Sequence, residues 1–145
     1  ALLHVIKHVE RMGDQCVNIA KMLPVVGYEP PSDEVMLEHI FKMGKLARSE
    51  VAQAKQAFLL RDVDVAQDLV RQDQESNRWH RGVFARAVEI GTDAVRREWA
   101  MSMMLVARAL ERIGDNAVDI GEQVAFVVTG LFREFSDASH VSRAR

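Results

Sequence analysis

The apolar residues of the chain recur at three- and four-residue intervals, and breaks in this pattern divide it into four expected helices. From first to last, these helices run from about Leu2 to Leu23, from Ser32 to Leu60, from Asp64 to Ile90 and from Thr92 to Thr129. Ser32, Asp64 and Thr92 are the expected N-caps, because their side-chain oxygens can accept hydrogen bonds from first-turn amides. The pattern predicts an all-α fold.

The breaks between these helices differ in length. Only the segment from Pro24 to Pro31, which also contains Gly27 and Pro30, is expected to form a long irregular connection. Short connections between long amphipathic helices favour antiparallel packing. The last three helices should therefore form an antiparallel three-helix bundle. The first helix either packs beside that bundle or belongs to a neighbouring bundle whose other helices are missing.

Helical spacing also predicts which side chains are buried. In the second helix the expected apolar stripe comprises Val35, Ile40, Met43, Leu46, Val51, Ala54 and Phe58. In the first helix the stripe contains Cys16, which is expected to be an inert core residue. Together with Val5, Val9, Met12 and Ile19, it would lack its normal cover if a neighbouring bundle were incomplete. The first helix is therefore expected to contribute to a homodimer or higher oligomer.

Two segments of the chain are similar to one another. "VERMGDQCVNIAK" (9–21) aligns with "LERIGDNAVDIGE" (110–122) at an offset of 101 residues. This repeat predicts a three-helix unit of about 100 residues that is used twice. Residues 1–28 would then be the last helix of the first unit with a linker, and residues 29–135 would be the second unit. Residues 136–145 are polar and are expected to form a frayed tail.

Composition narrows the class of protein further. The 145-residue chain has a formal net charge of −2 with both signs spread along it, which argues against a nucleic-acid-binding surface. The single cysteine excludes a disulfide framework within the chain. No apolar run approaches the ~20 residues needed to span a bilayer. A globular chain that does not span the membrane is expected.

The second copy of the repeat carries four acidic residues on one side of its helix. At about 100° per residue, Glu111, Asp115, Asp119 and Glu122 fall within an arc of about 80°. Like charges one turn apart repel each other. Bound cations would offset this repulsion, and closely spaced carboxylates suit cations that prefer oxygen ligands. Gly114 and Gly121 on the same helix would permit close approach of a neighbouring helix.

Nearby residues offer both partners and an alternative explanation for this acidic stripe. Asp73, Asn77 and His80 share one side of the third helix, and Asp73 is the strongest additional ligand among them. His80, beside Trp79, is better explained by packing, and His4 and His8 are unfavourably placed. Alternatively, Arg108 and Arg112 neutralise the acids through pairs three and four residues apart, which leaves a solvated charged face.

The repeated "ERMGDQCVNIA" and "ERIGDNAVDIG" resemble the signature helices of the PhoU family of bacterial phosphate-signalling regulators. The segments "AFLLRDVDVAQDLVRQDQESN" and "VAFVVTG" resemble the same family. The resemblance implies two three-helix bundles in tandem whose signature acids bind multinuclear metal clusters. Carried over by position, the implied metal ligands are Glu10, Asp14, Asn18, Asp73, Asn77, Glu111, Asp115, Asp119 and Glu122.

The resemblance also implies a cellular role. It suggests a cytoplasmic adaptor without catalytic activity between a phosphate ABC transporter and a sensor histidine kinase, which represses the phosphate-starvation response. The implied metal is a divalent ion or an iron cluster, with iron, zinc, manganese and magnesium as candidates. One alternative is a metal-free helical module whose acidic stripe docks a basic partner. A carboxylate-bridged metalloenzyme is disfavoured, because the chain has no Glu-x-x-His pair.

Overall fold

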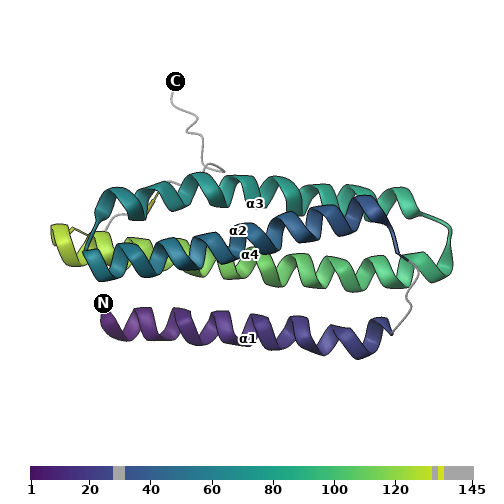
Figure 1. Cartoon of the computed structure of the whole chain (residues 1–145), viewed down its shortest axis with the longest axis horizontal. Helices are drawn as coiled ribbons and strands as arrows, with labels where there is room; N and C mark the ends of the chain where they lie inside the picture. Colours follow the sequence, from purple (N-terminus) through teal and green to yellow (C-terminus); the bar gives the residue numbers. More distant parts are fainter. Residues whose placement is uncertain (28–31, 132–133, 136–145) are drawn as a thin grey trace, which may run out of the picture.

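Four long helices make up the fold of the computed structural model, which describes residues 1–27, 32–131 and 134–135. They are α1 (Leu2–Val26), α2 (Glu34–Leu60), α3 (Val63–Ile90) and α4 (Ala94–Thr129). The helices lie side by side, and the described part of the chain contains no strand (Figure 1). The predicted all-α fold is confirmed. The expected frayed tail, residues 136–145, lies outside the described residues.

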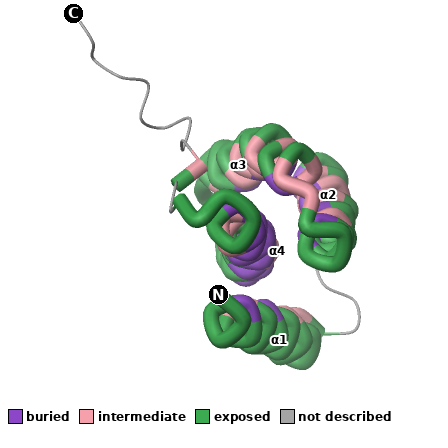
Figure 2. Tube along the Cα trace, turned by 90° about the vertical axis from the view of Figure 1, so that its left-hand side faces the viewer, coloured by how far each residue is buried: buried purple, intermediate pink, exposed green. Residues whose placement is uncertain are grey.

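The helix α4 is the centre of the structure. It contacts α1, α2 and α3, and it carries most of the buried residues. In the view along the helices, α2, α3 and α4 surround one core, and α1 packs on the far side of α4 (Figure 2). Val5 and Met12 of α1 are buried there, in a cluster that includes Ile113 and Ala117 of α4. Of the two placements expected for the first helix, the structure shows the one beside the bundle.

The three interior N-caps are all aspartates. Asp33 accepts a hydrogen bond from the Met36 amide at 3.0 Å, and Asp62 accepts one from the Val65 amide at 3.0 Å. Asp93 caps α4 in the same way, through two backbone amides. The predicted caps at Ser32, Asp64 and Thr92 were therefore wrong by one or two residues. Each true cap is a carboxylate, which also interacts favourably with the positive end of the helix dipole.

The first helix is longer than expected. It continues to Val26 and so includes Pro24, and it ends at Gly27, which has a φ of 85°. Pro24 has no amide to donate to the carbonyl four residues earlier, and its ring crowds that carbonyl, so it weakens α1 close to where the helix ends. The amide of Gly27 still donates to the Leu23 carbonyl at 3.2 Å. The predicted end at Leu23 was too early, and residues 28–31 of the expected irregular connection lie outside the described part of the chain.

The buried stripe of α2 matches the expected one only in part: Met43 and Ala54 are buried as predicted. Its buried residues are Met36, Met43, Ala47, Glu50, Ala54 and Ala57. Val35, Val51 and Phe58 of the expected stripe are exposed. Apolar residues lie on both sides of the buried arc, so periodicity alone does not choose between adjacent arcs. Packing against α3 and α4 selects the arc with more alanines, whose small side chains let the helices approach closely.

Cys16 is exposed rather than part of the core. Val9 is also exposed, at 56%, whereas Val5 and Met12 are buried. Only one side of α1 meets α4, because α1 is a single helix lying on the outside of a three-helix bundle (Figure 2). The prediction for Cys16 was therefore wrong, and the outward side of α1 presents apolar side chains to solvent.

Candidate metal-binding pocket

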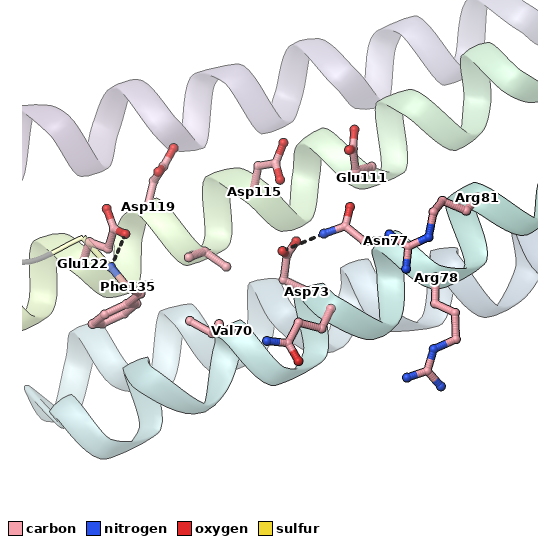
Figure 3. A pocket seen from close by; sticks show the side chains of 12 residues that line it. Val70, Asp73, Asn77, Arg78, Arg81, Glu111, Asp115, Asp119, Glu122 and Phe135 are labelled. Atoms are coloured by element: carbon pink, nitrogen blue, oxygen red, sulfur yellow. Dashed lines mark hydrogen bonds between the residues drawn. The ribbon is translucent and has the colours of Figure 1, made fainter. Parts of the chain in front are cut away.

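The acidic residues of α4 lie along a pocket between α3 and α4. The pocket has a volume of about 690 Å³. Its lining residues are Val70, Asp73, Gln74, Asn77, Arg78, Arg81, Glu111, Asp115, Val118, Asp119, Glu122 and Phe135 (Figure 3). The antiparallel packing of the two helices therefore brings together all four acids of the α4 stripe and both candidate ligands from the third helix.

Asp73 and Asn77 extend from α3 into the pocket. They lie one turn apart, and the Asn77 side-chain amide donates a hydrogen bond to Asp73 Oδ2 at 2.9 Å (Figure 3). This bond holds Asn77 with its nitrogen toward Asp73. Asp73 adds a negative charge from a second helix, whereas Asn77 contributes only a neutral amide.

Glu111, at one end of the stripe, is buried and has basic neighbours. It accepts a hydrogen bond from Arg108, three residues earlier on α4. The Nδ1 atom of His80 on α3 lies 3.7 Å from its other carboxylate oxygen. Arg108 thus neutralises one acid of the stripe, as the alternative of a solvated charged face requires. His80 has an electrostatic contact with the acids as well as its place beside Trp79.

Asp119 faces α1, where a histidine meets it. Nδ1 of His8 lies 3.2 Å from Asp119 Oδ2 and 2.9 Å from the Asn116 side-chain oxygen. With Nδ1 protonated, His8 donates to these oxygens and links the first helix to the acidic stripe. Helical spacing within α1 places His8 away from the acids of its own helix. The contact with Asp119 depends on how α1 packs against α4, which no spacing within α1 reveals.

Glu122 lies at the other end of the pocket. Its carboxylate accepts a hydrogen bond from the backbone amide of Phe135 at 2.7 Å (Figure 3). The Phe135 ring closes this end, and its edge would lie 3.2 Å from a side-chain carbon placed on Gly121. Leu69 and the Ala66 carbonyl of α3 approach the same point. Gly121 therefore permits the close approach of another helix that the sequence predicted.

The surroundings weaken the acidity of three of the four stripe residues. Loss of hydration between the helices, followed by the charges of Glu111 and Asp73, raises the pKa of Asp115 to about 7, although Asp115 is an exposed residue. Burial also raises the pKa of Asp119, against the opposing effect of His8, and that of Glu122. The nearby basic groups Arg108, Arg11 and His8 offset this effect only in part, and a cation in the pocket would add the missing positive charge.

The side chains do not form a closed coordination sphere as they stand. Among the residues that the structure describes, no three His, Cys, Asp or Glu side chains converge closely enough to hold an ion. The donor set nevertheless fits a hard or borderline cation, because carboxylate oxygens from two helices line one pocket. Binding would require the acids to turn toward a common point.

The first copy of the repeat lies apart from this pocket. Glu10, Asp14 and Asn18 on α1 are exposed, and none of the three lines the pocket. Asn18 donates only a long hydrogen bond of 3.5 Å to Gln15. Of the nine expected ligands, the structure brings six together and leaves these three on a separate surface.

Glu50 on α2 was absent from the predicted set. Glu50 is fully buried, and among the described residues neither of its carboxylate oxygens has a hydrogen-bond partner. Burial, with the charges of Asp73 and Asp115, raises its pKa to about 8. Its spacing of seven from Met43 and four from Ala54 would have placed it on the buried arc. The expected stripe contains Met43 and Ala54 but only apolar residues, so a charged residue on the same arc gave no signal.

Comparison with known proteins supports the family suggested by the repeated motif. Residues 40–124 match the model of the PhoU domain. The chain therefore belongs to the PhoU domain family.

Curated relatives cover most of the chain. A phosphate-specific transport system accessory protein PhoU homolog of Clostridium acetobutylicum is 25% identical over 134 residues, covering 92% of this chain and 60% of its own length. A PhoU homolog 1 of Thermotoga maritima is 32% identical and covers 84% of this chain and 53% of its own length. The chain thus spans between half and two thirds of the length of these relatives.

A solved structure has the same fold. The crystal structure of the phosphate transport system regulatory protein PhoU from Streptococcus pneumoniae superposes with a TM-score of 0.80 and 22% sequence identity. The match covers 89% of this chain and 60% of that protein. None of the helices in the described residues is both long and apolar enough to cross a membrane.

Proposed function

We propose that the chain is part of a metal-binding adaptor that negatively regulates phosphate uptake and phosphate-starvation signalling. The adaptor would connect the ATPase of a phosphate ABC transporter with a sensor histidine kinase, without catalytic activity of its own. It would act in the cytoplasm, at the inner face of the membrane through those partners. Family membership and the names of the relatives as phosphate transport accessory proteins support this role.

One observation carries the metal-binding part of the proposal. Acids from α3 and α4 line a single pocket, and three of the stripe acids have raised pKa values there. A bound cation would neutralise the stripe and join the two helices. The candidates are iron, zinc, manganese and magnesium, since carboxylate-rich sites accept several of these ions and cellular availability decides among them.

A second candidate function has its own support. Arg108 already pairs with Glu111, and in the described residues no three potential ligands converge on one point. Both observations fit a metal-free interaction module whose acidic stripe docks a basic partner surface. The two functions differ in whether the isolated protein retains metal.

Elemental analysis of protein purified without chelators separates these functions. The adaptor with a metal site should retain roughly stoichiometric metal, and Asp115→Ala should lose it. Metal-free protein that still binds a basic partner would favour the interaction module. An oxidase and hydrolase assay on the metal-loaded protein tests for a carboxylate-bridged metalloenzyme. Turnover above the Asp115→Ala background would contradict an adaptor without catalysis.

The regulatory part needs a separate measurement. Co-purification with the transporter ATPase and with the kinase, in cells grown with ample phosphate, should recover both partners. A phosphate-starvation reporter should be repressed when the gene is present and derepressed when it is deleted. Repression that persists after deletion would contradict the proposed negative regulation.

A further inference from the structure

The buried carboxyl group of Glu50 lies against the acidic motif of α4. A side-chain carbon added to Gly114 would sit 2.6 Å from Glu50 Oε2 and 3.2 Å from its carboxyl carbon. Gly114 lies between Ile113 and Asp115, so the missing side chain leaves room for a carboxyl group from α2. Glu50 thus reaches α4 at the residue that precedes a candidate metal ligand.

Three helices direct acids toward this region. The charges of both Asp73 on α3 and Asp115 on α4 act on Glu50, which itself comes from α2. The Oδ1 atom of Asp73 is buried as well. Glu50 does not line the open pocket but lies behind the wall to which Asp73 and Asp115 belong. The acids therefore extend from the mouth of the pocket into the core of the bundle.

Packing does not account for this glutamate. A buried carboxyl group is stabilised by hydrogen bonds or by an opposite charge, and without either it destabilises the fold. Within the described residues neither oxygen of Glu50 has a hydrogen-bond partner, and the side chain is 0% exposed. Other buried residues of this face of α2, such as Met43 and Ala54, are apolar. A methionine or leucine would fill the same space without this penalty.

We propose that Glu50 is an interior ligand of the metal site: when the acids turn toward a common point, it supplies a carboxylate from α2 to an ion held also by Asp73 and Asp115. The inference rests on the metal-binding function proposed above. An ion so bound would join all three helices of the bundle, rather than α3 and α4 alone. It would also provide the opposite charge that no described side chain supplies to Glu50.

Titration with Mn²⁺ tests this assignment, because Mn²⁺ prefers oxygen ligands. Calorimetry would compare wild type with Glu50→Gln, which keeps the size of the side chain, and with Glu75→Gln. Glu75 is an exposed glutamate of α3 outside the pocket, so its variant removes one charge without removing a pocket residue. Glu50→Gln should weaken Mn²⁺ binding at least about tenfold. Glu75→Gln should change it by less than about twofold.

Metal-free stability provides a second readout. If the Glu50 carboxyl group is a metal ligand, Glu50→Met should melt at a higher temperature than wild type in the presence of chelator. Added Mn²⁺ should raise the melting temperature of this variant little or not at all. Circular dichroism of each variant confirms that it is folded. A metal-free Glu50→Met that melts below wild type and a Glu50→Gln that binds Mn²⁺ like wild type would together overturn the assignment.

The failure of this inference is distinguishable from failure of the proposed function. If wild type binds no Mn²⁺, both are wrong. If Asp115→Ala loses the ion while Glu50→Gln retains wild-type affinity, the metal site stands and Glu50 is not a ligand. Anomalous diffraction from Mn²⁺-loaded wild-type crystals needs no variant. It should place the ion within about 2.0–2.6 Å of a Glu50 oxygen, the range for hard cations, and an ion beyond contact distance would overturn the inference.

Discussion

The two copies of the repeated motif have different surroundings. On α4, Glu111 is buried, Gly114 packs against Glu50, and the acids line a pocket shared with α3. On α1, Glu10 and Asp14 are exposed, and no described atom outside the helix lies within 4 Å of a side-chain carbon placed on Gly13. The motif thus supplies the carboxylates in both places, but only the packing of α3 against α4 turns them into a pocket.

The largest expected effect concerns the uncovered side of α1. Ile6 and Val9 are each 56% exposed, and burial of such residues is favourable at roughly 25 cal/mol per Å². We expect a homodimer or higher oligomer with α1 in the interface. A dissociation constant of about 10 μM for this dimer would correspond to a free energy of dissociation of about 7 kcal/mol. Analytical ultracentrifugation should find dimers for wild type and monomers for Val9→Glu.

Val88→Glu is the matched control for that measurement. Val88 on α3 is as exposed as the α1 residues but lies on a different face of the molecule, so its variant should remain associated. A wild-type chain that is monomeric at high micromolar concentration would contradict the prediction. Equal dissociation of both variants would show that α1 does not form the interface.

The second effect compares the two acidic stripes directly. The four α4 acids carry −4, whereas the matching α1 residues Glu10, Asp14, Asn18 and Lys21 sum to −1. A ligand at 100 times its dissociation constant stabilises the folded state by about 2.7 kcal/mol, a rise in melting temperature of roughly 5–10 °C for a chain of this size. Metal should raise the melting temperature of wild type and Asp14→Ala, but not that of Asp115→Ala. A metal-dependent rise that is lost in Asp14→Ala but kept in Asp115→Ala would assign the principal site to α1.

The third effect is a pH dependence of the metal-free protein. The pKa values of Asp115 and Glu50 are raised from their ordinary values of 3.8 and 4.5 to about 7 and about 8. The folded state therefore binds more protons than the unfolded state over this range, so the free energy of unfolding should fall as pH rises from about 4 to about 8. Below both unfolded pKa values this contribution is fully present, and above about 8 it is lost.

The free energy of unfolding, measured by denaturation at about pH 5 and about pH 8.5 in the presence of chelator, checks the direction of this pH dependence. Asp115→Asn and Glu50→Gln should each reduce the loss of stability between these two pH values, because each removes one titrating group. Asp14→Asn on the exposed stripe should leave the loss unchanged. An equal loss in all four proteins would contradict the raised pKa values of Asp115 and Glu50.

The smallest effect compares the glycines of the two motifs. Gly13→Ala should raise the free energy of unfolding by about 0.5–1 kcal/mol, because alanine favours the helix and open space surrounds the new carbon. Gly114→Ala should fall short of that gain by about 1 kcal/mol or more, because the Glu50 carboxyl group must move. Urea denaturation of both variants measures the difference. Equal gains would indicate that α2 does not press on α4 at Gly114.

The sequence alone determined the local features of this protein. The 3.6-residue periodicity of its apolar positions predicted four helices, because a helix face is a property of residues three and four apart. The repeated motif predicted the family and placed four acids on one side of α4. Asp73 could be named as a partner because short connections make the last three helices antiparallel neighbours. Helix ends were less accurate, since aspartates next to the predicted caps provide the actual ones.

Tertiary structure alone decided which faces meet. Glu50 belongs to the buried arc only because α3 and α4 pack on that side of α2, and apolar residues flank the arc on both sides. His8 meets Asp119 only because α1 packs against α4 in this register. Cys16 is exposed because one helix covers a single side of α1. Each of these contacts joins residues far apart in the chain, and local periodicity carries no information about which of several possible partners a helix face will contact.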